Sequence, residues 1–181
     1  MYKGNNPSAK RSQEWISQSL VSLMANKPFG QITVKEIMEN SNLSRQTFYQ
    51  VFDSIEEVLD YYLDTLFLKY LGHCKIGAVD NLCDAAKLFF QFFGENEPFI
   101  EALTRSEKTY ILQKKCQEYL QNDHFLQFTQ TGIHNLQEKT FASAFVTAGL
   151  VGMLGSWIQS GKVMGIEELA HLVCRVTNVE E

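Results

Sequence analysis

Apolar residues recur at helical spacing along most of the chain. In residues 8–26, for example, Ile16, Leu20 and Leu23 fall on one face of a helix. Strand-like alternation is scarce, and so is proline, at 3 residues. The same spacing predicts further helices at 34–40, 45–52, 55–67, 80–93, from about Pro98, 107–120, 139–160 and 166–176. The pattern therefore predicts an all-α protein with about nine helices.

Two short helices in the first third of the chain are bounded by capping signals. Thr33, followed three residues later by Glu36, is a capping-box pattern. Ser44 is suited to cap the next helix, and Asn42 in the turn between them tolerates a left-handed conformation. Two short helices joined by such a turn are typical of helix-turn-helix DNA binding. Any small three-helix unit gives a similar pattern, so the spacing alone leaves other functions open.

The segments on either side of this unit are also predicted from local signals. Residues 1–7 are polar and are expected to form a loose arm. Ser54 and Glu57 form a second capping-box pattern, which opens the helix predicted over 55–67.

The charges are distributed unevenly along the chain. Its 45% hydrophobic and 20% charged residues are a globular composition, and the net charge is −5. Residues 1–52 nevertheless contain six Lys or Arg and three Asp or Glu, whereas the remainder contains ten and eighteen. A basic head on an acidic body is suited to contact with phosphates, although with so few charges chance gives the same asymmetry.

Two segments carry a resemblance to a known family. FGQITVKEI at 29–37 and LSRQTFYQVF at 43–52 closely resemble the head of TetR-family transcriptional regulators, and the match covers about residues 8–67. The resemblance implies a helix-turn-helix head at 1–54, with its motif at about 33–52 and its packing extending to about 67. A helical-bundle body at 55–181 would then bind ligand and dimerise. The implied function is that of a cytoplasmic, homodimeric, sequence-specific DNA-binding regulator, a repressor whose affinity for a double-stranded operator is modulated by a small apolar effector.

The recognition helix of such a head points its N-terminal end at the bases. Arg45 can bind guanine or a phosphate, and Gln46 can bind adenine. The resemblance assigns a phosphate contact to Tyr49. The other predicted DNA contacts, which are hydroxyl, amide or cationic groups, are Thr33, Ser44, Thr47, Gln50 and Lys10. Capping, packing or plain solvent exposure is the simpler alternative for each of them.

Four departures from the family pattern lie in or next to this unit. Ser41-Asn42 replaces Ala-Gly, Val51 replaces a common His, Ile55 replaces a frequent Lys, and Asp53 adds an acid. They predict weaker contact with the DNA backbone, or compensation by other basic residues of the head. They also leave open an alternative function, a TetR-like co-regulator that acts mainly through a protein partner.

An uncharged stretch at 140–161 is long enough to span a membrane. Its hydroxyl and amide side chains, and the lack of a flanking basic cluster, favour a helix buried between subunits instead. In TetR-like proteins the last two helices form a four-helix dimer interface. We assign Gly149, Gly152, Gly155 and Trp157 to that interface, with an internal helix of a monomer as the alternative.

The body is rich in aromatic residues, and TetR-type bodies hold an apolar pocket with a few polar groups. We assign Phe89, Phe93, Cys116 and Tyr119 to this pocket, and a plain helical core is the alternative. Further candidates for its polar groups are His73, Gln113 and His134.

The cysteines give no CxxC pair. Cys74, Cys83, Cys116 and Cys174 are predicted to be unpaired, mostly buried thiols in a reducing cytoplasm. His73-Cys74 with Cys83 is too loose a grouping for a metal site, so neither metal nor cofactor is expected. The chain contains no GxSxG, Gly-rich phosphate loop or HExxH motif, and we do not expect an enzyme.

Overall fold

The computed structural model describes residues 1–76, 81–122 and 135–177, and in these ranges the chain forms nine α-helices, one 3₁₀ helix and no strand. The α-helices are α1 (Pro7–Met24), α2 (Val34–Ser41), α3 (Arg45–Val51), α4 (Ile55–Ile76), α5 (Leu82–Glu95), α6 (Glu97–Arg105), α7 (Thr109–Asn122), α8 (Leu136–Gln159) and α9 (Ile166–Thr177). The predicted all-α fold is confirmed. The largest difference from the expected bounds is α4, which continues well beyond residue 67.

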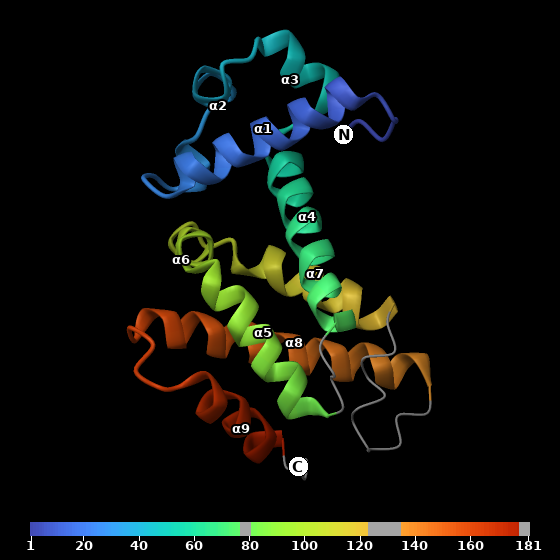
Figure 1. The fold of residues 1–181 in the computed structure, drawn as a ribbon, viewed down its shortest axis with the longest axis vertical. Coiled ribbons are helices and arrows are strands. Elements are labelled where there is room, and N and C mark those ends of the chain that lie inside the picture. Colours follow the sequence, from blue (N-terminus) through green and yellow to red (C-terminus); the bar gives the residue numbers. More distant parts are fainter. Residues whose placement is uncertain (77–80, 123–134, 178–181) are drawn as a thin grey trace.

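The molecule is elongated, with α1, α2 and α3 gathered at one end (Figure 1). Helix α4 runs from this end into a bundle formed by α5–α9, where α5 and α9 lie side by side and α7 lies along α8. Because α4 packs against α1 at one end and against α5 and α7 at the other, it is the continuous connection between the two parts.

The core of the first part comes from apolar positions spaced three or four residues apart. Ile16 and Leu20 of α1, Ile37 of α2 and Phe48 of α3 are all completely buried. Side chains at this spacing lie on one face of a helix, so each short helix contributes one face to a shared core. The opposite faces remain exposed.

A second connection links the end of α6 to the end of α1. The Arg105 guanidinium donates a hydrogen bond to the carbonyl of Ala25, at 2.9 Å, and another to that of Met24. The Phe29 amide donates to Ser106 Oγ, at 3.0 Å. Cationic side chains stabilise the C-terminal carbonyls of a helix, so Arg105 holds the end of α1 on the body.

The first residues are not the loose arm that their polar sequence predicts. The Tyr2 amide donates to the Val51 carbonyl at 2.8 Å, and the side chain of Gln13 donates to the Tyr2 carbonyl at 3.0 Å. These bonds join the arm to α1 and α3. Val51 is distant in the sequence and Gln13 is 11 residues away on α1, so the local composition of the arm does not reveal either bond.

The second capping box is only half formed. Ser54 Oγ accepts the Glu57 amide at 3.2 Å, as predicted. The Glu57 carboxylate, however, accepts the amide of Asp53, at 2.9 Å, instead of that of Ser54.

The prediction of four unpaired cysteines is wrong for two of them. Cys83 of α5 and Cys174 of α9 form a disulfide, with Cα atoms 5.9 Å apart and a sequence separation of 91. The pairing follows from the contact between α5 and α9, which the spacing of the cysteines does not reveal. Cys74 and Cys116 remain thiols.

This cross-link should make the stability of the protein depend on redox conditions. A disulfide restricts the unfolded chain, and one that closes a long loop typically stabilises by about 2–4 kcal/mol. We expect the wild type to unfold at a lower urea concentration when dithiothreitol is present, and Cys83→Ser to be insensitive to the reductant. Cys74→Ser, which keeps the disulfide, is the control. A reductant effect of equal size in Cys83→Ser would contradict the cross-link.

Helix α8 has 24 residues and is the one described helix long and apolar enough to cross a membrane by length and composition. Leu154 and Ile158 on one of its faces are buried in the bundle. Phe141 and Phe145 on another face are exposed. Its composition therefore reflects two apolar faces, one packed within the chain and one uncovered.

Candidate nucleic-acid interface

The turn between α2 and α3 has the geometry that the local signals predict. Thr33 Oγ1 accepts the Glu36 amide, and the Glu36 carboxylate accepts the Thr33 amide, so the capping box at the start of α2 is complete. Asn42 ends α2 with φ 55°, in the left-handed region that asparagine tolerates. Ser44 Oγ then caps α3 by accepting the Thr47 amide at 3.1 Å.

Helix α3 divides into a buried face and an exposed face. Phe48 and Val51 point into the core of the head, together with Phe52 just after the helix. Tyr49 is 64% exposed, with its ring edge-on to that of Phe48 at 5.3 Å. The residues that α3 exposes, in addition to Tyr49, are Arg45, Gln46 and Gln50. The structure thus brings all four of these predicted DNA contacts onto one short helix.

The predicted hydroxyl contacts have structural roles in the caps. The Thr33 hydroxyl donates to Glu36 Oε2 at 2.8 Å. The hydroxyls of Ser44 and Thr47 lie 2.9 Å apart and share a hydrogen bond. Local folding therefore occupies these groups, which hold the turn in the shape that exposes Arg45 and Gln46.

The cations of the head differ in how far they are neutralised. Lys27 pairs with Glu36 at 2.6 Å, and Lys35 with Glu39 at 3.7 Å. Within the described ranges Arg45, Arg11 and Lys10 take part in no salt bridge, and Lys10 donates to the side chain of Asn5. These three exposed cations, together with the exposed Lys3, which also takes part in no salt bridge in this part of the chain, are the ones left to meet an anionic partner.

Two departures from the family pattern have a structural context. Val51 is buried in the core, so this side chain takes no part in the exposed face. The Asp53 carboxylate lies 3.1 Å from the N-terminal ammonium group of Met1, which offsets its charge.

The pair between Lys27 and Glu36 gives a prediction about pH. Hydrogen bonds from Lys27, and then from Thr33, lower the pKa of Glu36 to about 2. Because the pKa is lowered in the folded state, Glu36 stabilises the fold above its unfolded pKa of about 4.3, and this contribution is lost as the pH falls towards 2. We expect Glu36→Gln to lower the urea midpoint at pH 7 and the difference from wild type to shrink below about pH 4.5. Glu39→Gln, on the same helix, is the control, and a difference independent of pH would contradict the expectation.

The residues assigned to a dimer interface separate into two groups. Gly149 and Gly152 are exposed and Gly155 is half-buried, and a Cβ built on any of them would meet no atom within 4 Å. Trp157 is only 7% exposed and its indole donates to the Met164 carbonyl at 2.7 Å. It packs inside the chain against Gly94, so it is not part of the exposed glycine face.

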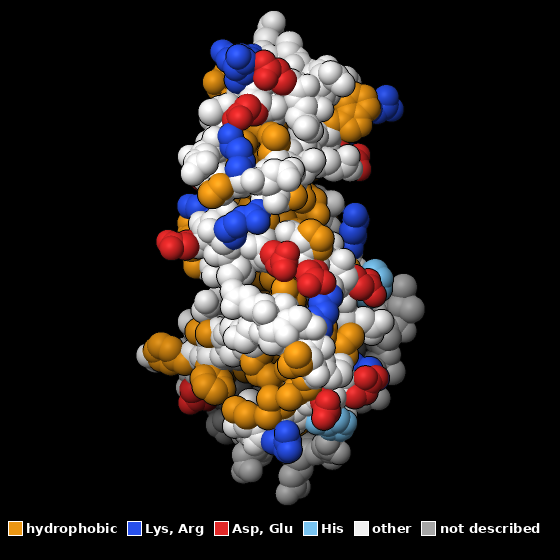
Figure 2. Space-filling model, turned by 90° about the vertical axis from the view of Figure 1, so that its left-hand side faces the viewer, with side chains coloured by type: hydrophobic (Ala, Val, Ile, Leu, Met, Phe, Trp, Pro, Cys, Tyr) orange, Lys and Arg blue, Asp and Glu red, His pale blue; other side chains and the backbone are white. Residues whose placement is uncertain are grey.

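The exposed glycine face continues into an apolar groove. Phe145, 67% exposed, lies one turn before Gly149 on α8. The groove runs between α5, α8 and α9, and its lining residues are Leu82, Phe145, Val146, Gly149, Leu150, Met153, Val173, Val176 and Thr177. Hydrophobic side chains also gather on the lower part of the body in the view of Figure 2. We call this face, formed by Phe141, Phe145, Gly149, Gly152 and the groove, the α8–α9 face.

The residues assigned to a ligand pocket do lie together. Phe89 and Phe93 are buried with ring centroids 4.7 Å apart, and both contact Tyr70. Cys116 is buried in the same core, close to Tyr70. Tyr119 stacks on Phe67 at 4.9 Å, and Phe67 lies 5.4 Å from Phe93. Burial raises the pKa of the Cys116 thiol, which keeps it protonated.

Sequence reasoning missed the α4 side of this cluster. Phe67 and Tyr70 of α4 contact Phe93, with ring centroids 5.4 and 5.5 Å from it. Tyr70 was overlooked because the helix was expected to end near residue 67, whereas Phe67 lay within the expected helix but was not assigned to the pocket. Of the polar candidates, His73 is exposed and Gln113 is half-buried, whereas His134 lies outside the described residues.

A buried lysine next to the cluster was also missed. Lys115 of α7 binds Asp64 at 2.8 Å and Asp60 at 3.0 Å, both on α4. Burial alone would lower the pKa of Lys115, but the hydrogen bonds with Asp64 and Asp60 outweigh it and raise the pKa. The sequence signal that could have indicated this site is the pair of acids, Asp60 and Asp64, four residues apart on α4. Lys115 fixes the middle of α4 to the body.

The chain is similar to known regulators of transcription. Residues 80–179 match the family model for a TetR transcriptional regulator C-terminal region. The chain is 25% identical over 177 residues, 94% of its length, to the uncharacterised HTH-type transcriptional regulator YxbF of Bacillus subtilis (strain 168). It is 32% identical over 61 residues, 34% of its length, to DhaS of Lactococcus lactis, an HTH-type activator of the dhaKLM operon. These matches span 46% of YxbF and 33% of DhaS, less than two thirds of either.

A solved structure agrees in fold. The TetR transcriptional regulator from Streptococcus agalactiae 2603V superimposes with a TM-score of 0.69 over 96% of both chains, at 22% identity. The family match covers more than half of the chain, and the all-α architecture agrees with it. The chain therefore belongs to the TetR family of transcriptional regulators.

Proposed function

We propose that the chain is a sequence-specific DNA-binding regulator whose head, residues 1–54, contacts an operator. The exposed face of α3 supports this most directly, since it carries Arg45, Gln46, Tyr49 and Gln50 on a helix anchored by Phe48. Arginine and glutamine are side chains that bind base edges in the major groove, and tyrosine suits phosphate. The further proposed contacts are Ser44 and Thr47 at the start of α3, Thr33 at the start of α2 and Lys10 on α1.

Selection of bound duplexes from a random DNA pool tests this function. A DNA-binding regulator should enrich one motif, with an affinity that falls steeply as salt rises because the head displaces counterions from phosphates. Failure to enrich any motif would favour the alternative, a co-regulator that acts through a protein partner. The exposed cations Arg45, Arg11 and Lys10 favour DNA over that alternative.

The body, residues 55–181, is proposed to form a homodimer through the α8–α9 face. Its exposed glycines allow close approach of a second copy, and its apolar groove would otherwise remain in contact with water. Two heads in one dimer read half-sites about 34–36 Å apart, so the recovered motif should be a palindrome with that spacing.

A small apolar effector is proposed to act through the aromatic cluster around Phe67, Phe89, Phe93, Cys116 and Tyr119. Since Phe67 belongs to α4, a ligand that displaces these rings would shift the helix that enters the head. Such a ligand changes operator affinity only if it binds one arrangement more tightly than the other. A tenfold change needs about 1.4 kcal/mol of differential binding.

The effector and the sign of regulation are tested together. Hydrophobic small molecules that raise the melting temperature would be titrated against the operator complex, and loss of affinity is expected. Stabilising molecules that leave operator affinity unchanged would contradict the coupling. A promoter reporter then separates the proposed repressor from an activator such as DhaS.

A further inference from the structure

Helix α3 depends on contacts from elsewhere for its shape. It has seven residues, and a helix this short is not stable on its own. The last carbonyls of any helix also lack partners within it. The Phe48 carbonyl accepts the Phe52 amide, but the carbonyl of Val51, the last residue of α3, accepts the amide of Tyr2 at 2.8 Å. A residue of the N-terminal arm thus closes the end of α3.

Tyr2, the residue of the arm that donates to α3, is itself held in place. Its carbonyl accepts the side-chain amide of Gln13, which is 3% exposed on α1. A buried amide of this kind requires a partner, and Tyr2 supplies it. The Tyr2 hydroxyl accepts the Asn6 amide at 3.1 Å, and a Cβ at Gly4 would overlap the Tyr2 ring. Residues 1–6 therefore form a compact turn between α1 and α3.

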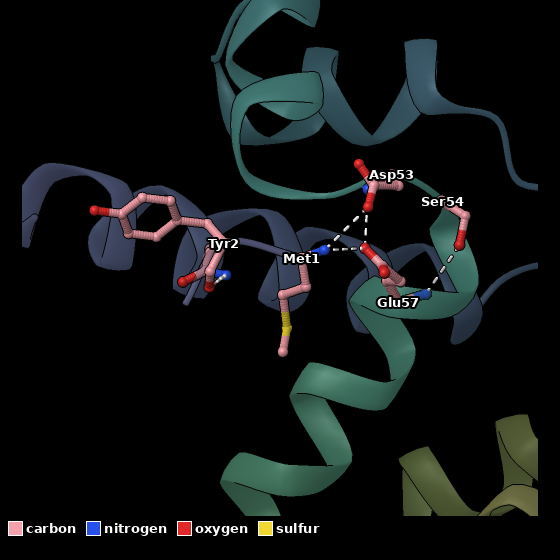
Figure 3. A network of polar contacts seen from close by, with 6 residues as sticks. Met1, Tyr2, Asp53, Ser54 and Glu57 are labelled. Carbon is pink, nitrogen blue, oxygen red and sulfur yellow. Dashed lines mark hydrogen bonds and ion pairs between the residues drawn. The ribbon is translucent and has the colours of Figure 1, made fainter. Parts of the chain in front are cut away.

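The same arm reaches the linker that follows α3. Figure 3 shows Met1 beside Asp53 and Glu57, with its ammonium nitrogen 3.1 Å from Asp53 Oδ2 and 2.8 Å from Glu57 Oε2. Glu57 also accepts the Asp53 amide. The contacts of Tyr2 with Val51 and Gln13 do not depend on this ion pair.

We propose that Tyr2 and Gln13 are positioning residues for DNA recognition. Tyr2 ties the C-terminal end of α3 to α1 through its main chain, and Gln13 holds Tyr2 in that position. Together they set the direction in which Arg45 and Gln46 leave the head. The inference rests on the proposed DNA-binding function and extends it to residues that do not touch DNA.

Loss of this positioning should weaken binding to the operator more than binding to unrelated DNA. Base readout requires a side chain to meet two groups on one base edge, whereas a phosphate contact carries no sequence information. A tilt of α3 therefore removes base contacts while the cations of the head still meet phosphates. Loss of the arm contact should lower operator affinity and leave affinity for unrelated DNA almost unchanged.

The test uses two disrupting variants, each with a matched control. Gln13→Leu removes the donor to Tyr2, and Gln18→Leu, an exposed glutamine on the same helix, is its control. Deletion of residues 2–5 removes the arm contact but keeps Asn6, which caps α1, and Lys3→Ala controls for the lost charge. Affinity for the selected operator and for a scrambled duplex is measured at a temperature at which circular dichroism shows each variant folded. Hydrogen exchange of the α3 amides is followed in the free protein.

We expect both disrupting variants to bind the operator at least tenfold more weakly, with less than twofold change on the scrambled duplex and faster exchange at residues 49–52. The controls should discriminate like the wild type. Unchanged exchange in α3, or equal losses on the two duplexes, would overturn the inference. A wild type that does not distinguish the duplexes would overturn the proposed function instead, and exchange in the free protein would still decide whether the arm holds α3.

Discussion

Replacing Arg45 by alanine should weaken operator binding by about 1–3 kcal/mol, or roughly fivefold to more than a hundredfold, the value of one bidentate base contact. Arg45 is the first residue of α3 and is exposed, directly after the Ser44 cap. It takes part in no salt bridge within the described residues, so its removal should leave the melting temperature almost unchanged. Fluorescence anisotropy titration of the operator, alongside thermal melting, measures both effects.

The control for this experiment removes one positive charge from the body, away from α3. Lys69 is exposed on α4 within the body, and Lys69→Ala makes the net charge of −5 one unit more negative, as Arg45→Ala does. A loss that is equally large in both variants would assign the effect to long-range electrostatics. Unchanged affinity in Arg45→Ala would remove Arg45 from the contact surface, whereas a loss confined to one position of the operator would identify the base it reads.

Gly152→Leu should dissociate the dimer without unfolding the protomer. Nothing lies within 4 Å of a Cβ at Gly152, so the side chain fits within one chain, and leucine favours the helix more than glycine does. In a closely packed interface the same side chain costs typically about 1–3 kcal/mol. A two-fold interface contains the substitution twice. The dimer dissociation constant should therefore rise by a factor between about thirty and about twenty thousand.

Analytical ultracentrifugation of both proteins measures this change. Gly72→Leu is the matched control, because Gly72 is an equally open helical glycine on α4, outside the α8–α9 face. Gly152→Leu should sediment as a monomer at concentrations at which wild type and Gly72→Leu are dimers, with a melting curve that shows an intact fold. A wild type that is monomeric at high concentration would remove the α8–α9 face from the dimer assignment.

Much of the head could be predicted from sequence because its determinants are local. A capping box needs only Thr33 and Glu36, and the turn needs only an asparagine that accepts φ 55°. The division of α3 into a buried Phe48 and an exposed Tyr49 follows from helical periodicity. The exposure of the predicted contacts on α3 therefore depends only on residues a few positions away in the sequence.

The tertiary structure decided the features that join distant segments. Cys83 meets Cys174, Lys115 meets Asp60 and Asp64, and Tyr2 meets Val51, each across about fifty residues or more. Helical periodicity shows which face of a helix is apolar but does not show what that face packs against. For this reason an apolar Trp157 and an open Gly152, five residues apart on α8, had the same predicted role although one is inside the protomer and the other is on its surface.

The sequence by itself thus determined the family, the all-α class and the exposed face of α3, since these follow from short-range pattern and from motif spacing. Only the tertiary structure decided that the polar N-terminal residues are bonded to α1 and α3 instead of forming a loose arm. Their hydrogen-bonding groups are satisfied by the Val51 carbonyl and the Gln13 side chain, which approach them only once α1, α3 and α4 have packed around a common core.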